Sequence, residues 1–173
     1  MKRLAAFLFL SLLISQTFAS KRDSVLLTGS VYSNEDKVTH VIIKIFDGNN
    51  LLKSVEVGRS NRFRTYLPVN KYLTIQIEAP GFHDKRFSFD SHIPDGTMPI
   101  PSYDFDMDIF KEEEVQGVNT SILDFPVGLV YYDEKKGQFV HNKSYTKKMK
   151  KEYYNLLEKA KMAERSLLKE SEN

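Results

Sequence analysis

The chain has 173 residues, no cysteine and a formal charge of +2, which comes from 25 basic and 23 acidic side chains. Because the two signs nearly balance, the composition argues against a dedicated nucleic-acid-binding protein. Without cysteine there is no disulfide framework and no residue to carry a lipid anchor. We therefore expect a mature protein that is not a lipoprotein and that is held together by core burial.

Residues 1–19 have the features of a signal peptide. Lys2 and Arg3 precede an apolar run over residues 4–14, and Thr17 and Ala19 offer small side chains at the −3 and −1 cleavage positions. The run is too short to span a membrane, and an uncleaved membrane anchor is the alternative interpretation. We expect export to the periplasm or cell envelope and no transmembrane segment after cleavage. Loss of Lys2 and Arg3 leaves 23 basic and 23 acidic residues.

A series of short strands is predicted between residues 25 and 90. In residues 73–79, Leu73, Ile75 and Ile77 share one face and polar residues fill the other. Such period-two alternation is typical of a strand with one buried face. Similar segments cover residues 25–32, 38–46, 51–57, 63–67 and 86–90, and turn pairs such as Asp47-Gly48 separate them. This spacing predicts an antiparallel β-sandwich. Gly29 lies inside the first strand, where it indicates a bulge or a close backbone approach.

Several short motifs in this region carry a family resemblance. They are Gly29-Ser30-Val31, the apolar strand 41–46, Asn61-Arg62-Phe63, Leu67-Pro68, the strand 72–79 and Gly81-Phe82. Their order resembles the carboxypeptidase regulatory-like domain over roughly residues 24–90. The resemblance implies a transthyretin-like, Ig-like sandwich of about seven strands, and it implies no catalytic residue. The whole chain is also similar to small exported proteins of Gram-negative envelopes, for which no activity is implied.

The sandwich domain is predicted to cover residues 20–110. After a proline-rich loop at residues 92–102, the last strand alternates Tyr103, Phe105, Met107 and Ile109 with three aspartates. Residues 111–142 form a connector that is too apolar to be a free linker. We expect it to lie against the body, and residues 127–132 could add an edge strand.

The C-terminal segment, residues 143–173, is predicted to form one long amphipathic helix over residues 144–168. Asn142 or Ser144 could cap its start. An apolar stripe along one face comprises Tyr145, Met149, Tyr153, Leu156, Ala160, Ala163 and Leu167. From residue 143 the chain holds 9 basic and 5 acidic residues, whereas the preceding body is acidic. The stripe could dock on its own sandwich, or it could be an interaction surface for a partner or a second copy.

Only weak candidates for a chemical site are present. Asp104, Asp106 and Asp108 share one strand face, and hard cations bind such oxygens. A straight strand separates them by about 7 Å, however, so an exposed acidic face that receives the basic helix is the simpler interpretation. The four histidines are scattered and lack zinc-binding spacing.

No motif for catalysis or for cofactor binding occurs. We therefore expect a non-enzymatic interaction or structural module of the cell envelope that needs no cofactor and whose partner is another envelope protein. Carbohydrate or small-ligand binding through the sandwich loops is the first alternative. A metal-dependent module at the three aspartates is a weaker one.

Overall fold

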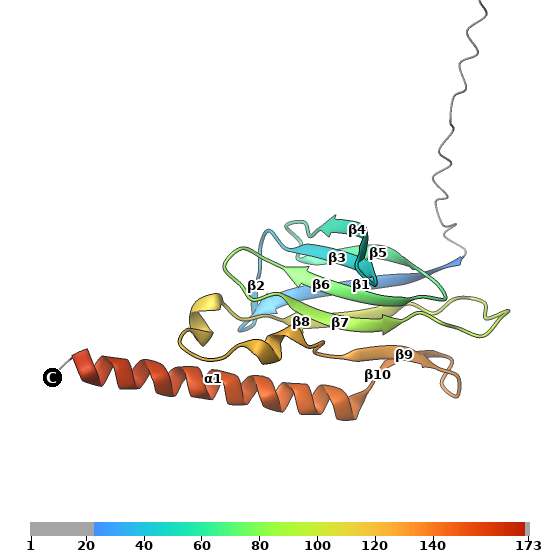
Figure 1. Cartoon of the computed structure of the whole chain (residues 1–173). Coiled ribbons are helices and arrows are strands. Elements are labelled where there is room, and N and C mark those ends of the chain that lie inside the picture. Colours follow the sequence, from blue (N-terminus) through green and yellow to red (C-terminus); the bar gives the residue numbers. More distant parts are fainter. Residues whose placement is uncertain (1–22, 172–173) are drawn as a thin grey trace, which may run out of the picture.

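The computed structural model describes residues 23–171, so the predicted signal peptide lies outside the described residues (Figure 1). Strands precede a single long helix. The elements are β1 (Ser24–Ser33), β2 (Asp36–Lys37), β3 (Ile42–Asp47), β4 (Asn50–Glu56), β5 (Arg62–Pro68), β6 (Tyr72–Glu78), β7 (Lys85–Asp90), β8 (Tyr103–Asp108), the 3-10 helices η2 (Glu112–Val115) and η3 (Ser121–Asp124), β9 (Leu129–Asp133), β10 (Gln138–His141) and α1 (Lys143–Ser171).

The strands form two sheets of unequal width. In the first sheet β1 lies between β5 and β8, with the short β2 also beside β1. The second sheet has six strands in the order β10-β9-β7-β6-β3-β4. Pairing is mostly antiparallel, and the exceptions are β1 with β8 and β7 with β9. The predicted fold, a mainly β sandwich followed by a long helix, is confirmed, although β2, β9 and β10 raise the number of strands above seven.

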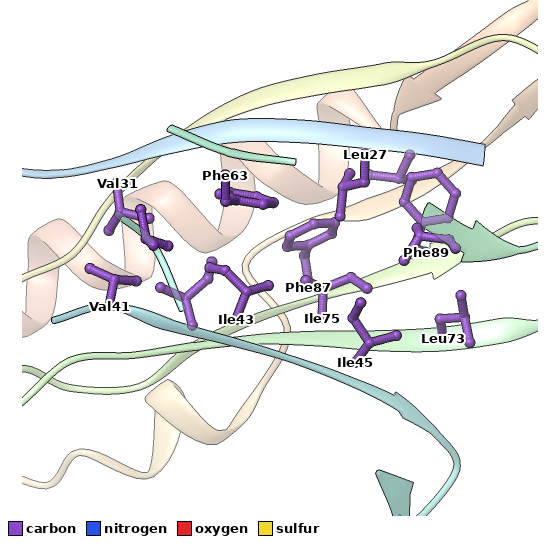
Figure 2. Close-up of a cluster of buried hydrophobic side chains, with 14 of the residues drawn as sticks. Leu27, Val31, Val41, Ile43, Ile45, Phe63, Leu73, Ile75, Phe87 and Phe89 are labelled. Carbon is purple, nitrogen blue, oxygen red and sulfur yellow. The ribbon is translucent and has the colours of Figure 1, made fainter. Parts of the chain in front are cut away.

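Apolar side chains from both sheets fill the space between them (Figure 2). Leu27, Ile43 and Ile75 are fully buried, and Ile45 is nearly so. The predicted inward faces are therefore correct, since alternate residues of β3, β5, β6 and β7 are the buried ones. Phe105 of β8 joins the layers, because its ring centre lies 4.7 Å from that of Phe87 in the opposite sheet.

Gly29 marks a close backbone approach and not a bulge. A Cβ atom at this position would meet the carbonyl oxygen of Phe105 and the ring of Phe63. β1 is in unbroken register with β5 and β8 around Gly29, and an irregularity of pairing lies instead between Ile45 and Phe46. The missing side chain therefore lets three strands meet closely.

The second sheet continues into the predicted connector. β9 pairs with β7 on one side and with β10 on the other, so it is an internal strand and not an edge. The pairing starts where the Val127 N–H donates to the Arg86 carbonyl at 2.7 Å and the Ser88 N–H donates to the Gly128 carbonyl at 3.0 Å. The sandwich thus extends to His141, beyond the boundary at residue 110 that the alternation indicated.

Helix α1 packs on the remaining connector through a second apolar cluster. Phe110, the last residue of the predicted sandwich domain, and Val115 and Leu123 of the connector form this cluster with Met149 and Leu156 of the helix. Asn142 caps the helix, since its side-chain oxygen accepts the Tyr145 N–H at 3.1 Å. Figure 1 shows α1 running along one side of the sandwich and ending beyond the strands. Within residues 23–171, no helix combines the length and apolarity that a membrane crossing requires.

Candidate functional site

A groove lies between β8 and the first half of α1, with a volume of about 540 Å³. All six residues of β8 line it, and so does one face of the helix. We call it the β8–α1 groove, and its lining residues are Lys85, Phe87, residues 103–108, Phe110, Val127, Gly128, Val130, His141, Thr146, Met149, Lys150, Tyr153, Tyr154 and Leu157.

One wall of the groove is an edge strand. β8 pairs with β1, and no other strand of the described chain pairs with β8. Its inward side chains Tyr103, Phe105 and Met107 are only half-buried, although the pattern predicted a core face. They are incompletely covered because the first sheet ends at β8, whereas the second continues beneath it to β9 and β10. The groove follows from this difference in width.

The floor and the opposite wall of the groove are mainly apolar. Phe87 of β7 and Val130 of β9 contribute from the wider sheet. Met149 and Leu157 contribute from α1, and both belong to the contacts that hold the helix on the connector. An apolar trough with few polar groups is the usual character of a ligand or peptide site.

Lys85 is the only buried cation among the described residues, with 9% of its surface exposed. Its ammonium group donates to the Asp108 carbonyl and lies 5.2 Å from the ring centre of Phe110 and 5.1 Å from that of Tyr153. Burial lowers the pKa of Lys85 from 10.5 to about 8, and the nearby Asp108 opposes this shift. The lysine therefore joins the end of β8 to the helix at one end of the groove.

Two hydroxyl groups in the groove have no hydrogen-bond partner among the described residues. They belong to Thr146 and to Tyr153, whose side chain is 8% exposed. Burial raises the pKa of Tyr153 to about 12; Tyr145 adds to the shift and Arg86 opposes it. The phenol is therefore a neutral group that can both donate and accept a hydrogen bond. An unpaired buried polar group costs about 1–3 kcal/mol. Both hydroxyl oxygens are buried from solvent, and Asn61, Thr65 and Arg86, which do not line the groove, also hold unpaired polar atoms.

The three aspartates of β8 are spread along the outer rim of the groove. Asp104 contacts Thr28 and an Arg62 guanidinium nitrogen, the latter at 3.3 Å, and Asp108 accepts the Asn34 N–H at 3.1 Å. Asp106 takes part in no hydrogen bond or ion pair within residues 23–171. In that same range no three acidic or histidine side chains are close enough to hold a metal ion. Asp104, Asp106 and Asp108 therefore do not come together as a metal site.

The aspartate row does not receive the basic helix through ion pairs. Lys150 is the one helix lysine that lines the groove, and its ammonium group lies 5.8 Å from the Tyr154 ring centre. No ion pair within the described chain joins a lysine of α1 to the row. The helix is held by the apolar cluster instead.

The predicted helix stripe divides into two parts. Met149, Tyr153, Leu156 and Ala160 are buried, and Tyr145 is half-buried. The Tyr145 hydroxyl donates to the Pro126 carbonyl at 2.9 Å. Further along, Ala163 is half-buried and Leu167 is 66% exposed. The first part of the stripe thus lies against the chain's own body, whereas the last turns do not.

The histidines do not form a site. His40, His92 and His141 are exposed, and the half-buried His83 packs its ring 5.6 Å from that of Phe110. Lys85 is a site residue that motif patterns do not reveal, although the strand pattern contains a signal for it. Lys85 alternates with Phe87 and Phe89, so the strand pattern places its side chain on the inward face.

Comparison with known proteins finds only weak similarities. No protein-family profile matches the sequence, and no curated protein does either. Among solved structures, S.CueP is similar at a TM-score of 0.37 and 11% identity, over 51% of this chain and 62% of that one. Catechol 1,2 dioxygenase from Acinetobacter radioresistens has a TM-score of 0.40 and 11% identity, over 57% of this chain and 55% of that one.

A third similar structure is the dioxygenase domain of a carbohydrate-binding fusion protein from Streptomyces sp. SirexAA-E. It has a TM-score of 0.35 and 13% identity, over 54% of this chain and 85% of that domain. The chain spans less than two thirds of S.CueP and of the Acinetobacter enzyme. At these TM-scores and identities the similarities assign no activity to this chain.

Proposed function

We propose that this chain is a non-enzymatic interaction module of the cell envelope and that the β8–α1 groove is its binding site. The observation that carries the proposal is the mainly apolar groove that lies between the unpaired edge of β8 and the first half of α1. A surface that only closed the fold would not leave an open trough beside an unpaired strand edge.

Export to the envelope is part of this proposal. It is supported by the charged start and apolar run of residues 1–19. The resemblance of residues 24–90 to a carboxypeptidase regulatory-like domain is a further part. It is supported by the order of the motifs and by the β-sandwich itself. Such domains are scaffolds without catalytic groups, which agrees with an interaction role.

The partner would be another envelope protein. A photo-crosslinking side chain placed at Met107, which lines the groove, tests this in the cells that make the protein. We expect one discrete crosslinked species from position 107. The same group at Leu52, an exposed position on the edge strand β4, should give none. Equal crosslinking from both positions, or none from position 107, would contradict the proposal.

Small-ligand binding in the same groove is a second candidate. A volume of about 540 Å³ lies within the range of about 300–1,000 Å³ that is common for ligand pockets. A thermal-shift screen of glycans and metabolites would support the candidate if a compound raised the Tm of the parent and left Tyr153→Phe unchanged.

A further inference from the structure

The unpaired edge of β8 indicates which kind of partner segment the groove would bind. We propose that the groove takes up an extended segment of the partner protein, which pairs with β8 as an added strand and which alternates apolar and basic residues. This inference rests on the proposed function, because it names what enters the same groove.

The backbone of β8 is arranged to accept a strand. In a parallel ladder only alternate residues hydrogen-bond to a given neighbour. Phe105 turns its carbonyl toward Gly29 of β1, and the Ile109 N–H donates to the Tyr32 carbonyl at 2.8 Å. The backbone groups of Asp104 and Asp106 therefore face the groove. Unpaired donors and acceptors along a strand edge are a template for β-strand addition.

The position beside β8 lies over the wider sheet. Phe105 and Tyr103 of β8 pack on Phe87 and Phe89 of β7, so β8 lies above β7. The next strand in the second sheet is β9, and no strand of the first sheet lies opposite it. A strand added to β8 would cover Val130 of β9, and its apolar side chains would meet the floor and the helix wall.

The length of the added strand is set by β8 itself. All six residues of β8 line the groove. Lys85 donates to the Asp108 carbonyl and thereby occupies the edge at that end. Six residues in extended conformation span about 20 Å. The partner segment would then have five to seven residues, as a single strand commonly has.

The charge of the rim selects basic residues at alternate positions. Side chains of an added strand that point outward become neighbours of Asp104, Asp106 and Asp108, because cross-strand pairs share a face. Asp104 is already near Arg62, but Asp106 has no charged partner within the described residues. Among the described residues of α1, Lys150 is the one charged side chain that lines the groove. The rim is therefore predominantly acidic, and lysine or arginine complements it.

Tyr153 and Thr146 supply the contacts on the helix side. Their hydroxyl groups lack partners, and both line the groove across from β8. The second edge of the inserted strand faces α1. Both hydroxyl oxygens are buried in the free protein, so the backbone of the inserted strand would reach them only after the two side chains turn toward the groove.

The test uses the mature chain, residues 20–173, and an acetylated, amidated peptide of seven residues that alternates lysine and valine. Hydrogen exchange should show the amides of Asp104 and Asp106 slowed at least about tenfold by saturating peptide, because strand pairing protects them. A peptide of the same composition with all lysines before all valines should leave both amides unchanged. A peptide with two central prolines should do the same, since it lacks two donors.

Two matched variants locate the charge effect. Asp106→Asn should weaken binding of the alternating peptide by about threefold to fivefold, as expected for loss of one cross-strand ion pair. Asp95→Asn, in the exposed loop before β8, should leave binding unchanged. Equal losses in both variants would overturn the role of the aspartate row.

The outcomes separate this inference from the proposed function. If the peptide binds and Tyr153→Phe weakens it while the amides of Asp104 and Asp106 stay unprotected, the groove binds partners but strand addition is wrong. If neither peptide order binds at millimolar concentration, strand addition is likewise overturned. The crosslinking from position 107 then still decides the proposed function independently.

Discussion

The ammonium group of Lys85 lies 5.1 Å from the centre of the Tyr153 ring, and this contact joins a strand of the sandwich to the C-terminal helix. Both side chains are buried and both line the groove. A cation over an aromatic face is attracted by the ring electrons, more strongly where water is excluded. The same ammonium group also donates a hydrogen bond to the Asp108 carbonyl. Lys85 of β7 therefore connects the second sheet to both the edge strand β8 and the helix α1.

The burial of Lys85, which disfavours its charged form, predicts an unusual dependence of stability on pH. Between pH 8 and pH 10 the folded Lys85 has lost its proton, because its pKa is about 8, whereas the unfolded lysine keeps it. The unfolded state then binds more protons, so the free energy of unfolding rises with pH, by about 2 kcal/mol. Above pH 10 the raised pKa of Tyr153 acts in the opposite direction, since the folded phenol stays protonated while the unfolded one ionises.

Urea unfolding at pH 7.5 and pH 9.5 measures this effect, and Lys85→Met is the control. The variant retains every other titrating group, so its stability should lose the rise that the parent shows. A parent whose stability is equal at both pH values would contradict the burial of a charged Lys85.

Two tyrosines on α1 offer a matched comparison. Tyr153→Phe removes a hydroxyl without a protein partner, so the free energy of unfolding should stay equal or rise slightly. Tyr145→Phe removes a hydroxyl that donates to the Pro126 carbonyl, and it should cost about 1 kcal/mol. Chemical denaturation of both variants gives the two values. A larger loss in Tyr153→Phe would mean that its hydroxyl is already satisfied in the free protein.

Gly29 should be intolerant of any side chain. A methyl group there would collide with the Phe105 carbonyl and the Phe63 ring, and such overpacking costs about 1–3 kcal/mol. Gly58 is the control, because a Cβ there meets nothing within 4 Å. We expect Gly29→Ala to lower the Tm clearly and Gly58→Ala to leave it nearly unchanged. Similar Tm values for the two variants would refute the close packing of β1 on β8.

Shortening the helix at two points distinguishes its two parts. A chain that ends at Asn142 loses the cover over Phe110, Val115 and Leu123, and we expect it to aggregate. A chain that ends at Glu164 keeps the buried stripe through Ala160 and should retain the parent's Tm and solution mass. Light scattering with a melting curve checks both. Association of the parent that disappears in the longer truncation would instead assign the exposed turns around Leu167 to self-association.

The sequence predicted the strands of the sandwich well, because burying one face of a strand imposes a period of two. Ile75 and the residues two positions before and after it are an example, because all three face the core. β9 and β10 were harder to predict. Each is short, and β9 pairs with β7 in parallel through only a few residues, so no long alternation marks them.

The groove could not be predicted from local pattern. It exists because β8 pairs with β1 and leaves its other side without a strand, and that pairing joins residues distant in sequence. Tyr103, Phe105 and Met107 look like core positions in the sequence, and only the unequal widths of the sheets leave them half-buried. The alternation in β8 predicts that the three aspartates share one face of the strand. Their position on the rim of a groove depends on α1, which forms the opposite wall.

The parallel pairing of β1 with β8 also determines when β8 can join its sheet during folding. Thr28 and Asp104 meet across 76 positions of sequence, so the edge strand joins its sheet only after most of the chain is available. Contacts between such distant segments form slowly and late during folding. A partner that recognises the edge of β8 would therefore bind only molecules in which this long-range pairing has already formed.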